Sequence, residues 1–506
     1  MQPAEQKGST EEILEYATEK NALIAEDALE LLKETGNFRE LIDRALAEGA
    51  FFIGKETVEL LLPKQKIAPH MPDAVMQHTG FRPLAKETQS RLRLLKQYDV
   101  TGQSKNSGKV KDFQLFFQKK FELLSAILRK RHTLSPKPIG RLKAVPNRAE
   151  VDVIGMVLKK WPTKNGNIAM HFEDTEAKCI VIIPQGDAAL TLLAEHIMLD
   201  DVIAIRAVKL DNDMLIAKEI LWPDLPVRER KTTESNVAIA TTSDMHVGSK
   251  LFLEKPFNQF LEWLNGRAGS AKEMEKAGKI KYLIISGDNV DGIGVYPNQF
   301  SELNIKDINL QYKEFSKFIT QIPEYIEILI CPGQHDAVRL ADPQPAVAEQ
   351  FVPELYKMGN IHFVGSPSWM EIEGLTTMVY HGAALHDLIS SSSFLNYDHP
   401  ELAMIEALKR RDLMSAYGLK HTYAPEKEDY MVIREEPDLV VLGDMHHNSY
   451  GNYRGTTVIN NGTWQSRTPY QVKLGHIPTL GIVPVMDIKT GKITENHFLE
   501  AGDERQ

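Results

Sequence analysis

The feature that most constrains the fold is a series of apolar runs, from about residue 235 onward, that end in acidic residues or histidines. Helix-like stretches such as residues 310–321 and 346–359 separate the earlier runs. Buried strands that alternate with helices form layered α/β sheets, and polar residues that follow parallel strands gather at one edge. We therefore expect residues 233–506 to form an α/β sandwich with one polar site. The polar residues that follow five of the runs are Asp244, His246, Asp288, Gln334, His335, Asp336, His381, Asp444 and His446.

These residue types suit divalent metal ions. Carboxylates and neutral imidazoles ligate Mn²⁺, Fe²⁺ and Zn²⁺, and a carboxylate between two ions can bridge them. Two ions about 3.5–4 Å apart can hold a phosphodiester, activate a water and stabilise the leaving oxygen. In the Asp-x-His pairs at 244/246 and 444/446, alternate residues of an extended strand end are expected to point the same way. A lone pair of this kind is more often a surface or helix-cap feature, whereas five such motifs in this order predict a metallophosphoesterase.

The motifs Gly-Asp-x-x-Asp at 287–291, Gly-Gln-His-Asp at 333–336 and His-Gly at 381–382 complete the order. The whole order resembles that of calcineurin-like phosphoesterases and the related double-strand-break repair nucleases. The resemblance implies two divalent ions, preferably Mn²⁺, with Mg²⁺, Fe²⁺ or Zn²⁺ as alternatives. It implies that the ligands are Asp244, His246 and His446 at the first ion, Asp288 as the bridge, and Gln334, His381 and Asp444 at the second ion. By the same resemblance His335 is the general acid or the transition-state stabiliser near the leaving oxygen, and Asp336 orients it.

Two residues depart from the pattern of these phosphoesterases. The family usually has asparagine where this chain has Gln334, and histidine where it has Asp444. Both substitutes can ligate a divalent ion through oxygen, but glutamine is longer by one methylene and aspartate adds a negative charge. Both changes fall on the second metal position. That position is therefore expected to be weaker, altered in metal preference or filled only with substrate.

Four segments resemble the small subunit of archaeal family-D DNA polymerases, namely residues 287–299, 331–345, 424–433 and 460–471. Residues 380–388 fit less well, because an arginine and an acidic pair are expected after the His-Gly motif. The resemblance implies a 3′-5′ exonuclease that acts on single-stranded or mismatched DNA ends. It also implies a large polymerising subunit as partner, and contact with the sliding clamp through that complex.

Two other functions stay open. The same scaffold can serve as a non-catalytic polymerase subunit, in which case Gln334 and Asp444 mark a lapsed site. A small-molecule or protein phosphatase is disfavoured, because a β-barrel domain and a basic segment have no obvious use in such an enzyme.

The first 140 residues divide by charge. Residues 1–60 contain 14 Asp/Glu and 6 Lys/Arg, and apolar residues at helical spacing predict a small helical module over 1–65. Residues 81–140 contain 14 Lys/Arg and 4 Asp/Glu, so we expect a basic linker over 66–140 with one amphipathic helix at 112–132. The charge fits a phosphate backbone as well as it fits a solvated helix face or an acidic partner. The phenylalanines of that helix recur at helical spacing, which favours core packing over base stacking.

The segment 141–232 contains short strands and one helix-like piece at 187–199. Five strands with a helix before the last ones predict an OB-fold barrel. OB-folds often bind single strands through aromatic stacking and basic grooves. Because these strands carry few aromatic residues that could be exposed, protein docking is favoured over strand binding.

Residues beside the motifs have both structural and functional interpretations. Asp291 is expected to structure its loop rather than to ligate a metal. His386 and His447 are candidates for contacts with DNA phosphates. Tyr296 and Trp464 fit base stacking and core packing equally well.

The two cysteines, Cys179 and Cys331, lie far apart in apolar runs. They are predicted to be buried thiols in a reducing cytoplasm, and two cysteines so far apart exclude a cysteine-based zinc site within the chain. The N-terminal sequence lacks a secretory pattern, and the sequence contains no run of about 18 apolar residues. We therefore expect a cytoplasmic protein that does not bind membranes.

Overall fold

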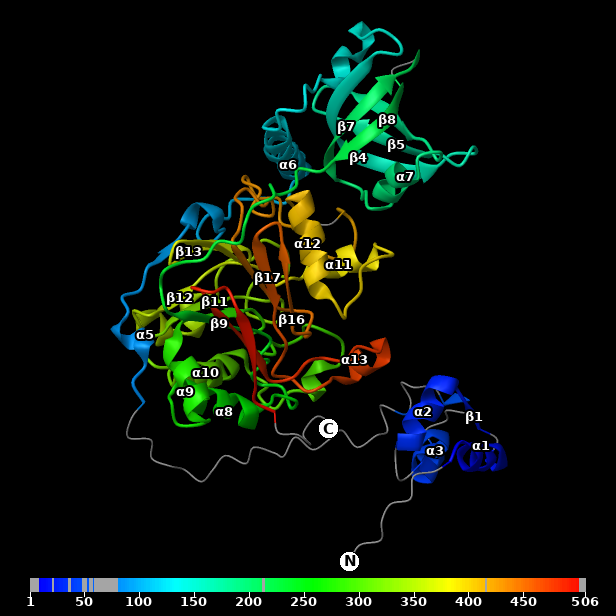
Figure 1. The fold of residues 1–506 in the computed structure, drawn as a ribbon. Helices are drawn as coiled ribbons and strands as arrows, with labels where there is room; N and C mark the ends of the chain where they lie inside the picture. Colours follow the sequence, from blue (N-terminus) through cyan, green and yellow to red (C-terminus); the bar gives the residue numbers. More distant parts are fainter. Residues whose placement is uncertain are drawn as a thin grey trace, which may run out of the picture. The chain divides into compact units, whose positions relative to one another are not determined.

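The computed structural model describes residues 9–20, 22–34, 38–47, 52–53, 58, 81–211, 214–414 and 416–499 (Figure 1). The chain divides into two compact units, residues 1–73 and 74–506. Within the described ranges, no helix is both long and apolar enough to cross a membrane.

The described residues of the first unit include three helices. These are α1 (Thr10–Glu19), α2 (Glu26–Glu34) and α3 (Phe38–Ala47), and the two-residue strands β1 (Leu23–Ile24) and β2 (Phe52–Ile53) pair in parallel. A capping box begins α1, because the Ser9 hydroxyl accepts from the Glu12 amide and the Glu12 carboxylate accepts from the Ser9 amide. Ile13 and Ile42, at the predicted apolar positions, are buried in its core. The predicted boundary at residue 65 lies outside the described residues.

The second unit contains a closed five-stranded barrel. The strands are β4 (Glu150–Pro162), β5 (Ile168–Glu173), β6 (Lys178–Ile183), β7 (Val202–Lys209) and β8 (Met214–Leu221), in the order β4-β5-β6-β8-β7. Helix α7 (Ala188–Glu195) lies between β6 and β7 in the chain. Alternate residues of β6, among them Cys179 and Val181, point into the barrel core. The five strands and the intervening helix of the predicted barrel are therefore present.

Two six-stranded sheets form the rest of the second unit. The first has the order β12-β11-β10-β9-β18-β19 and contains β9 (Ala238–Thr242), β10 (Ile280–Ser286), β11 (Glu327–Cys331), β12 (Ile361–Phe363), β18 (Ile482–Asp487) and β19 (Ile493–His497). The second has the order β16-β17-β15-β14-β13-β3 and contains β3 (Leu92–Leu94), β13 (Ser368–Ile372), β14 (Leu375–Val379), β15 (Leu439–Leu442), β16 (Ser449–Tyr453) and β17 (Thr456–Asn460). The central strands of both sheets are parallel, as in β9 to β12 and in β14, β15 and β17.

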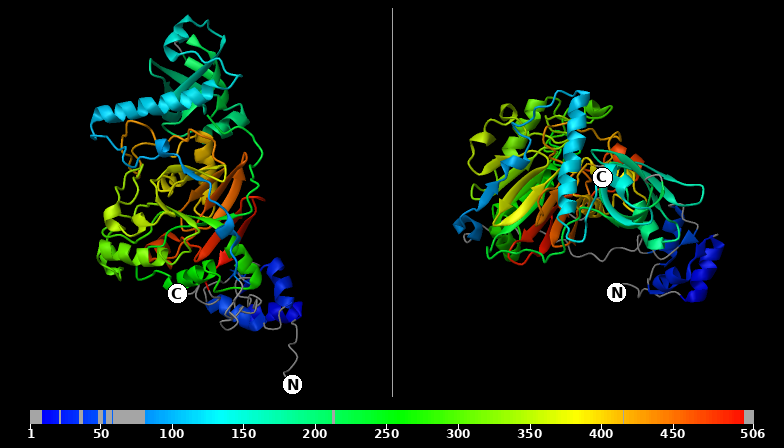
Figure 2. Two further views of the ribbon diagram at one scale, coloured as in Figure 1. Left: turned by 90° about the vertical axis from the view of Figure 1, so that its left-hand side faces the viewer. Right: turned by 90° about the horizontal axis from the view of Figure 1, so that it is seen from above.

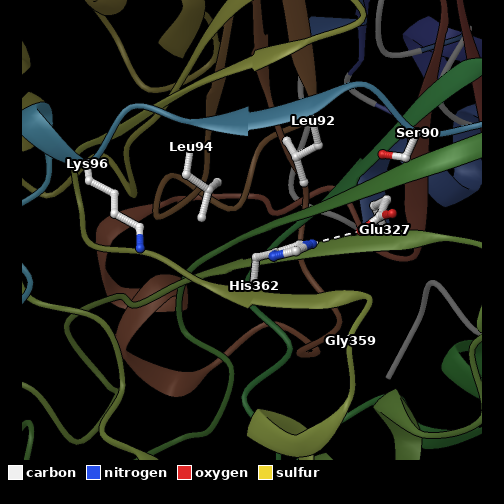
Figure 3. A pocket seen from close by; sticks show the side chains of 7 residues that line it. All are labelled: Ser90, Leu92, Leu94, Lys96, Glu327, Gly359 and His362. Carbon is white, nitrogen blue, oxygen red and sulfur yellow. Dashed lines mark hydrogen bonds and ion pairs between the residues drawn. The ribbon is translucent and has the colours of Figure 1, made fainter.

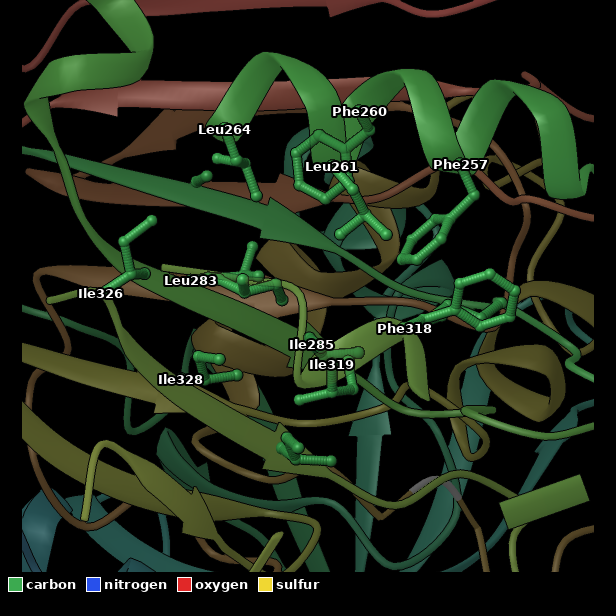
Figure 4. Packing of buried hydrophobic residues seen from close by; sticks show 14 of the residues in the cluster. Phe257, Phe260, Leu261, Leu264, Leu283, Ile285, Phe318, Ile319, Ile326 and Ile328 are labelled. Atoms are coloured by element: carbon green, nitrogen blue, oxygen red, sulfur yellow. The ribbon is translucent and has the colours of Figure 1, made fainter. Parts of the chain in front are cut away.

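The sheets face each other, and helices cover both outer faces. Ile284 and Val441 are among the residues that fill the space between the sheets. The first sheet is covered by α8 (Glu254–Leu264), α9 (Ala271–Lys279) and α10 (Ile308–Ile319), and the second by α11 (Leu385–Ser390) and α12 (Pro400–Arg410). Figure 4 shows Phe257 and Phe260 of α8 above Leu283 of β10. Because central strands are buried on both sides, all seven residues of β10 are buried, which explains the continuous apolar runs in the sequence.

Shorter helical segments connect these elements. They are α5 (Leu84–Glu87), α13 (Pro469–Leu474) and 3₁₀ turns at Lys96–Tyr98, Ile139–Ala144, Gln299–Ser301, Glu349–Phe351 and Leu355–Lys357. Both cysteines are buried and neither forms a disulfide, which confirms the prediction of buried thiols.

The described part of the predicted linker is folded into the second unit. β3 pairs antiparallel with β13 at the edge of the second sheet, and three residues are too short a run to be recognised by alternation. Helix α6 (Val110–Arg129) lies between the barrel and the sheets (Figure 2). Phe121 packs against barrel residues and Phe116 against the helices of the second sheet, so the prediction of core packing is confirmed for both. This segment joins the barrel to the sheets through packed apolar contacts.

One basic residue of the predicted linker, Lys120 in α6, is buried. Its side chain is 1% exposed, and its Nζ lies 2.6 Å from Oδ2 of Asp412. The position is therefore a buried ion pair between α6 and the chain that follows α12, and it offers no charge to a nucleic acid. Part of the local excess of basic residues is used inside the fold.

We expect Lys120→Met to destabilise the second unit, because the buried Asp412 carboxylate loses its cation. Removing one partner of a buried ion pair typically costs about 3–5 kcal/mol. Scanning calorimetry should show a lower unfolding temperature, and Lys120→Met with Asp412→Asn should recover part of the loss. Lys119→Met is the matched control, because the Lys119 side chain is 29% exposed and its ion pairs are long. A Lys120→Met protein as stable as the parent would exclude a contribution from this pair.

Candidate metal centre

The residues that follow the parallel strands of both sheets converge at one end of the sandwich. Asp244 and His246 follow β9, Asp288 follows β10, Gln334 and His335 follow β11, His381 follows β14, and Asp444 and His446 follow β15. Backbone contacts join these loops, because the His246 amide donates to the Asp288 carbonyl and the Asp444 amide to the Asp244 carboxylate. The two sheets therefore contribute side chains to a single cluster.

Five of these residues have left-handed backbone conformations. Asp244, His246 and Asp288 have φ of 51°, 49° and 49°, and Asp444 and His446 have φ of 67° and 52°. The expectation that Asp-x-His lies on extended backbone is therefore wrong. A left-handed residue turns the chain sharply, and this turn directs the side chains inward. Such conformations cost of the order of 1–3 kcal/mol each and are retained mainly at functional sites.

Three groups of side chains are close enough to hold an ion. In each group the potential ligand atoms lie within 4.8 Å of one another, and the groups are Asp244 with His246 and His446, His246 with Asp288 and His335, and Asp244 with Asp288 and His381. Asp288 is shared by two groups, as are Asp244 and His246, and a shared carboxylate is the arrangement expected of a bridging ligand. Its Oδ2 lies 3.3 Å from Nε2 of His381 and 3.9 Å from Nε2 of His246.

Three imidazoles are oriented through Nδ1. Nδ1 of His246 lies 3.1 Å from Oδ1 of Asp291, and Nδ1 of His381 lies 2.7 Å from the Ser286 carbonyl. Nδ1 of His335 lies 2.7 Å from the Asp291 carbonyl. Since these oxygens accept hydrogen bonds, each Nδ1 carries a proton, and in the neutral ring Nε2 is free to bind a metal. Burial lowers the pKa of His246, which favours this neutral form.

The donor atoms fit divalent cations. Oδ1 of Asp244 and Nε2 of His381 are buried and have no hydrogen-bond partner, which costs about 1–3 kcal/mol for each such group. Oδ1 of Asp244 lies 3.2 Å from Nε2 of His446, and Nε2 of His446 lies 3.1 Å from Nε2 of His246. Neighbouring ligands about 2.1 Å from an octahedral ion lie about 3 Å apart, so these separations suit a shared ion.

His446 differs from the other histidines in its hydrogen bonding. Nε2 of Gln471, from α13, lies 2.9 Å from Nδ1 of His446, and Oε1 of Gln471 accepts from the Thr468 amide. This arrangement places the proton of a neutral His446 on Nε2. Ligation through Nε2 therefore requires loss of that proton and rotation of the Gln471 amide.

At the second metal position, the two unusual residues contact each other. Nε2 of Gln334 donates to Oδ1 of Asp444 at 3.1 Å, and the same oxygen lies 3.5 Å from Nε2 of His381. Although burial works against the charged form, His386 and His381 lower the pKa of Asp444 to about 2. Asp444 belongs to none of the three groups described above, so this position is less compact than the first.

Asp336 makes no hydrogen bond to the ring of His335. The prediction that Asp336 orients this ring is therefore wrong. Its carboxylate accepts from the hydroxyl of Tyr312 at 2.8 Å, the amide of Gly333 at 2.9 Å and the side chain of Asn289 at 2.9 Å. Burial and the charge of Asp288 raise the pKa of Asp336 to about 6. Asp336 thus joins the loops after β10 and β11, while the Asp291 carbonyl orients His335.

Residues beside the motifs have clear positions. Asp291 is buried and holds Nδ1 of His246, so it positions a candidate ligand in addition to structuring its loop. Its Oδ1 also accepts from Nε2 of Gln465 at 2.9 Å, a contact that no motif predicts. Trp464 is buried among Phe257 and Phe260, which excludes base stacking at this position.

The remaining candidates lie near the cluster. The Tyr296 hydroxyl donates to Glu302, and the Tyr296 ring lies 6.0 Å from that of His335. Nε2 of His386 lies 3.0 Å from Oδ2 of Asp444. His447 is half-buried, and its contact with a phosphate stays a prediction.

A cavity elsewhere in the second unit shares no residue with this cluster. It has a volume of about 450 Å³ and lies between β3 and β12, where Leu92 and Leu94 face His362 (Figure 3). Nε2 of His362 lies 2.8 Å from Oε2 of Glu327, so two polar groups of this cavity pair with each other. The metal centre is therefore the better candidate for chemistry.

Comparison with known proteins identifies the family. The family of DNA polymerase alpha/epsilon B subunits matches residues 239–452. The DNA polymerase II small subunit of Archaeoglobus fulgidus is 37% identical over 463 residues, which cover 90% of this chain and 92% of that protein. The chain belongs to the archaeal DNA polymerase II small-subunit family. The small subunit of Methanocaldococcus jannaschii is 37% identical, over 82% of this chain and 70% of that protein. The small subunit of Halobacterium salinarum is 32% identical, over 85% of this chain and 82% of that protein.

A solved structure described as a novel archaeal phosphodiesterase aligns with 51% of this small-subunit chain and 99% of its own chain. The sequence identity is 15% and the TM-score is 0.27, which is too low to establish a shared fold.

We expect Asp291→Asn to weaken metal binding, because the carboxylate that fixes the tautomer and orientation of His246 is lost. Partners of this kind typically contribute 10- to 100-fold to metal affinity. Titration with Mn²⁺ by isothermal calorimetry should show the change. Asp307→Asn is a control at the exposed N-cap of α10, outside the candidate ligand motifs. Equal Mn²⁺ affinities in Asp291→Asn and the parent would exclude this role.

We expect Gly333→Ala to disrupt the centre, because an added Cβ would lie 2.1 Å from Oδ1 of Asp288 and 2.6 Å from Nε2 of His381. The variant should bind Mn²⁺ at least tenfold more weakly, as measured by the same titration. Gly359→Ala is the matched control, since an added Cβ there meets nothing within 4 Å. Unchanged Mn²⁺ binding in Gly333→Ala would show that Asp288 and His381 are not ligands as arranged.

Proposed function

We propose that the chain is a metal-dependent 3′-5′ exonuclease that acts on single-stranded or mismatched DNA ends. The observation that carries the proposal is the convergence of carboxylates and imidazoles from both sheets on the shared Asp288. Membership of the polymerase small-subunit family supports DNA as the substrate. We assign residues 233–506 to the calcineurin-like phosphoesterase class and residues 141–232 to the OB-fold class.

The proposed ligands form two sets that share one carboxylate. They are Asp244, His246 and His446 at the first ion, Asp288 between the ions, and Gln334, His381 and Asp444 at the second ion. When bound, two divalent ions supply Lewis acidity toward a phosphodiester and an attacking water. Mixed oxygen and imidazole donors favour Mn²⁺, with Mg²⁺, Fe²⁺ or Zn²⁺ as alternatives.

We assign to His335 the donation of a proton to the leaving oxygen. The Asp291 carbonyl accepts a hydrogen bond from Nδ1 of His335. The other ring nitrogen, Nε2 of His335, lies 3.9 Å from Oδ2 of Asp288 and so faces the cluster. Although burial works against protonation, the charges of Asp288 and Asp291 raise the pKa of His335. An imidazolium with a proton on Nε2 near neutral pH suits a general acid. Asp336 supports this role indirectly, because it holds the loop that carries His335.

The partners follow from the same proposal. The chain pairs with the large polymerising subunit of a family-D DNA polymerase, binds a single-stranded or primer 3′ end, and meets the sliding clamp through the complex. We propose a cytoplasmic location and no membrane partner. The barrel is assigned to protein docking.

A second function, that of a scaffold subunit with little or no catalytic activity, is supported by one observation. Gln334 presents its amide nitrogen, which is a donor, to Asp444. A glutamine ligates metals through its oxygen, so the second ion requires rotation of this amide. A scaffold would keep the fold and the large-subunit contact without metal-dependent cleavage.

We expect the chain with its large subunit to release 3′ nucleotides from mismatched and single-stranded DNA with Mn²⁺ or Mg²⁺. His335→Ala should reduce the rate by about 10²- to 10⁴-fold, the usual contribution of a general acid. Gel analysis of end-labelled oligonucleotides measures this rate, and a chelator should abolish it. His399→Ala, at a side chain that is exposed and paired with Glu401, is the matched control.

Three results would contradict the proposal. If neither the parent nor His335→Ala cleaves DNA with any metal, while both still bind the large subunit, the scaffold function would be favoured. Hydrolysis of a nitrophenyl phosphomonoester but not of DNA would favour a small-molecule phosphatase. Equal cleavage by the parent and His335→Ala would remove His335 from the reaction.

A further inference from the structure

His386 lies at the exposed side of the candidate metal centre, near the start of α11. Its side chain is 43% exposed, yet both ring nitrogens have partners. Nε2 lies 3.0 Å from Oδ2 of Asp444, and Nδ1 lies 3.3 Å from the hydroxyl of Tyr397. Because a tyrosine hydroxyl can donate to Nδ1, the proton of the neutral ring is available on Nε2 for the carboxylate.

The Asp444 carboxylate is held from two sides. Oδ2 lies at ion-pair distance from Nε2 of His386 and has no well-aligned hydrogen bond, whereas Oδ1 lies 3.1 Å from Nε2 of Gln334 and 3.5 Å from Nε2 of His381. An imidazole in ion-pair contact with one carboxylate oxygen limits rotation of the group and so favours one direction of the other oxygen. Hydrogen-bond partners outside the ligand set orient metal ligands in this way.

We propose that His386 is a positioning residue for the second metal position, where it holds Oδ2 of Asp444 so that Oδ1 faces His381. This inference rests on the proposed two-metal function. In the described part of the chain, the hydrogen-bond and ion-pair contacts of His386 are with Asp444 and Tyr397. The first metal position does not share these contacts, so the effect of His386 is confined to the second ion.

The exposure of His386 also fits a direct contact with a DNA phosphate. Nε2, which would donate to the phosphate, already faces Asp444 at 3.0 Å. Nδ1 is turned toward Tyr397 and away from that role. The geometry therefore favours action through Asp444, and the two roles differ in what they change. A positioning residue changes metal affinity without DNA, whereas a phosphate contact changes DNA affinity without metal.

The test is a titration of the full chain with Mn²⁺, without DNA, by isothermal calorimetry and by electron paramagnetic resonance of the bound ions. The parent should bind two ions. His386→Ala should retain the first affinity and lose 10- to 100-fold in the second, the usual range for such partners. His386→Gln should recover most of the loss, because its amide nitrogen can donate from about the same position as Nε2. His497→Ala is the matched control, since His497 is exposed and pairs with Glu495 on β19.

The outcomes separate this inference from the proposed function. A parent that binds no ion would overturn the two-metal proposal itself. A parent that binds two ions, with His386→Ala unchanged in both affinities, would overturn only the role of His386. If His386→Ala binds an oligonucleotide more weakly in the absence of metal, while its Mn²⁺ binding is intact, His386 contacts a DNA phosphate. That result would also overturn the inference. Loss of both ions together, or a lower unfolding temperature of the metal-free variant, would show a general structural role instead.

Discussion

The buried carboxylate of Asp288 is the group on which the rest of the site depends. It lies where strands of the two sheets end. Its Oδ1 accepts a hydrogen bond from the His335 amide at 2.9 Å, and its Oδ2 lies 3.3 Å from Nε2 of His381. A buried charge is costly unless cations or donors surround it. Here the neighbours come from the ends of β9, β10, β11 and β14, so the charge is tolerated only while both sheets keep their packing. The apolar layer between the sheets therefore supports the chemistry as well as the fold.

The same crowding explains the unusual backbone. Candidate ligands in left-handed conformations bring their side chains into a small volume, and each conformation carries a cost. The glycines before them leave space for this approach, because a Cβ at Gly287 would lie 2.2 Å from the His381 ring and one at Gly333 would collide with Asp288. Close approach and strain at one end of the sandwich are consistent with a site kept for function at the expense of stability.

The second metal position shows how two departures from a pattern can be related. Gln334 and Asp444 lie 110 residues apart in the chain, yet their side chains share a hydrogen bond, and Asp444 also faces His386. A change at one of these positions alters the contacts of the others. The three residues therefore form one arrangement. The Gln334 amide and the Asp444 carboxylate contact each other, and Asp444 also lies next to the His386 imidazole of α11.

The sequence by itself determined the α/β character of the chain from residue 235, the strands that end in the cluster, the five-stranded barrel and the residues that converge, because strand periodicity and polar strand ends are local signals. The helix expected at residues 346–359 was wrong, since the structure has two short 3₁₀ turns there, Glu349–Phe351 and Leu355–Lys357. The sequence did not predict β3, the buried pair of Lys120 and Asp412, or the left-handed turns in the Asp-x-His motifs. Nor did it reveal that Asp291, rather than Asp336, contacts the imidazoles of His246 and His335. These features depend on contacts between segments far apart in the chain, and only the packing of the two sheets and the barrel decides which side chains meet.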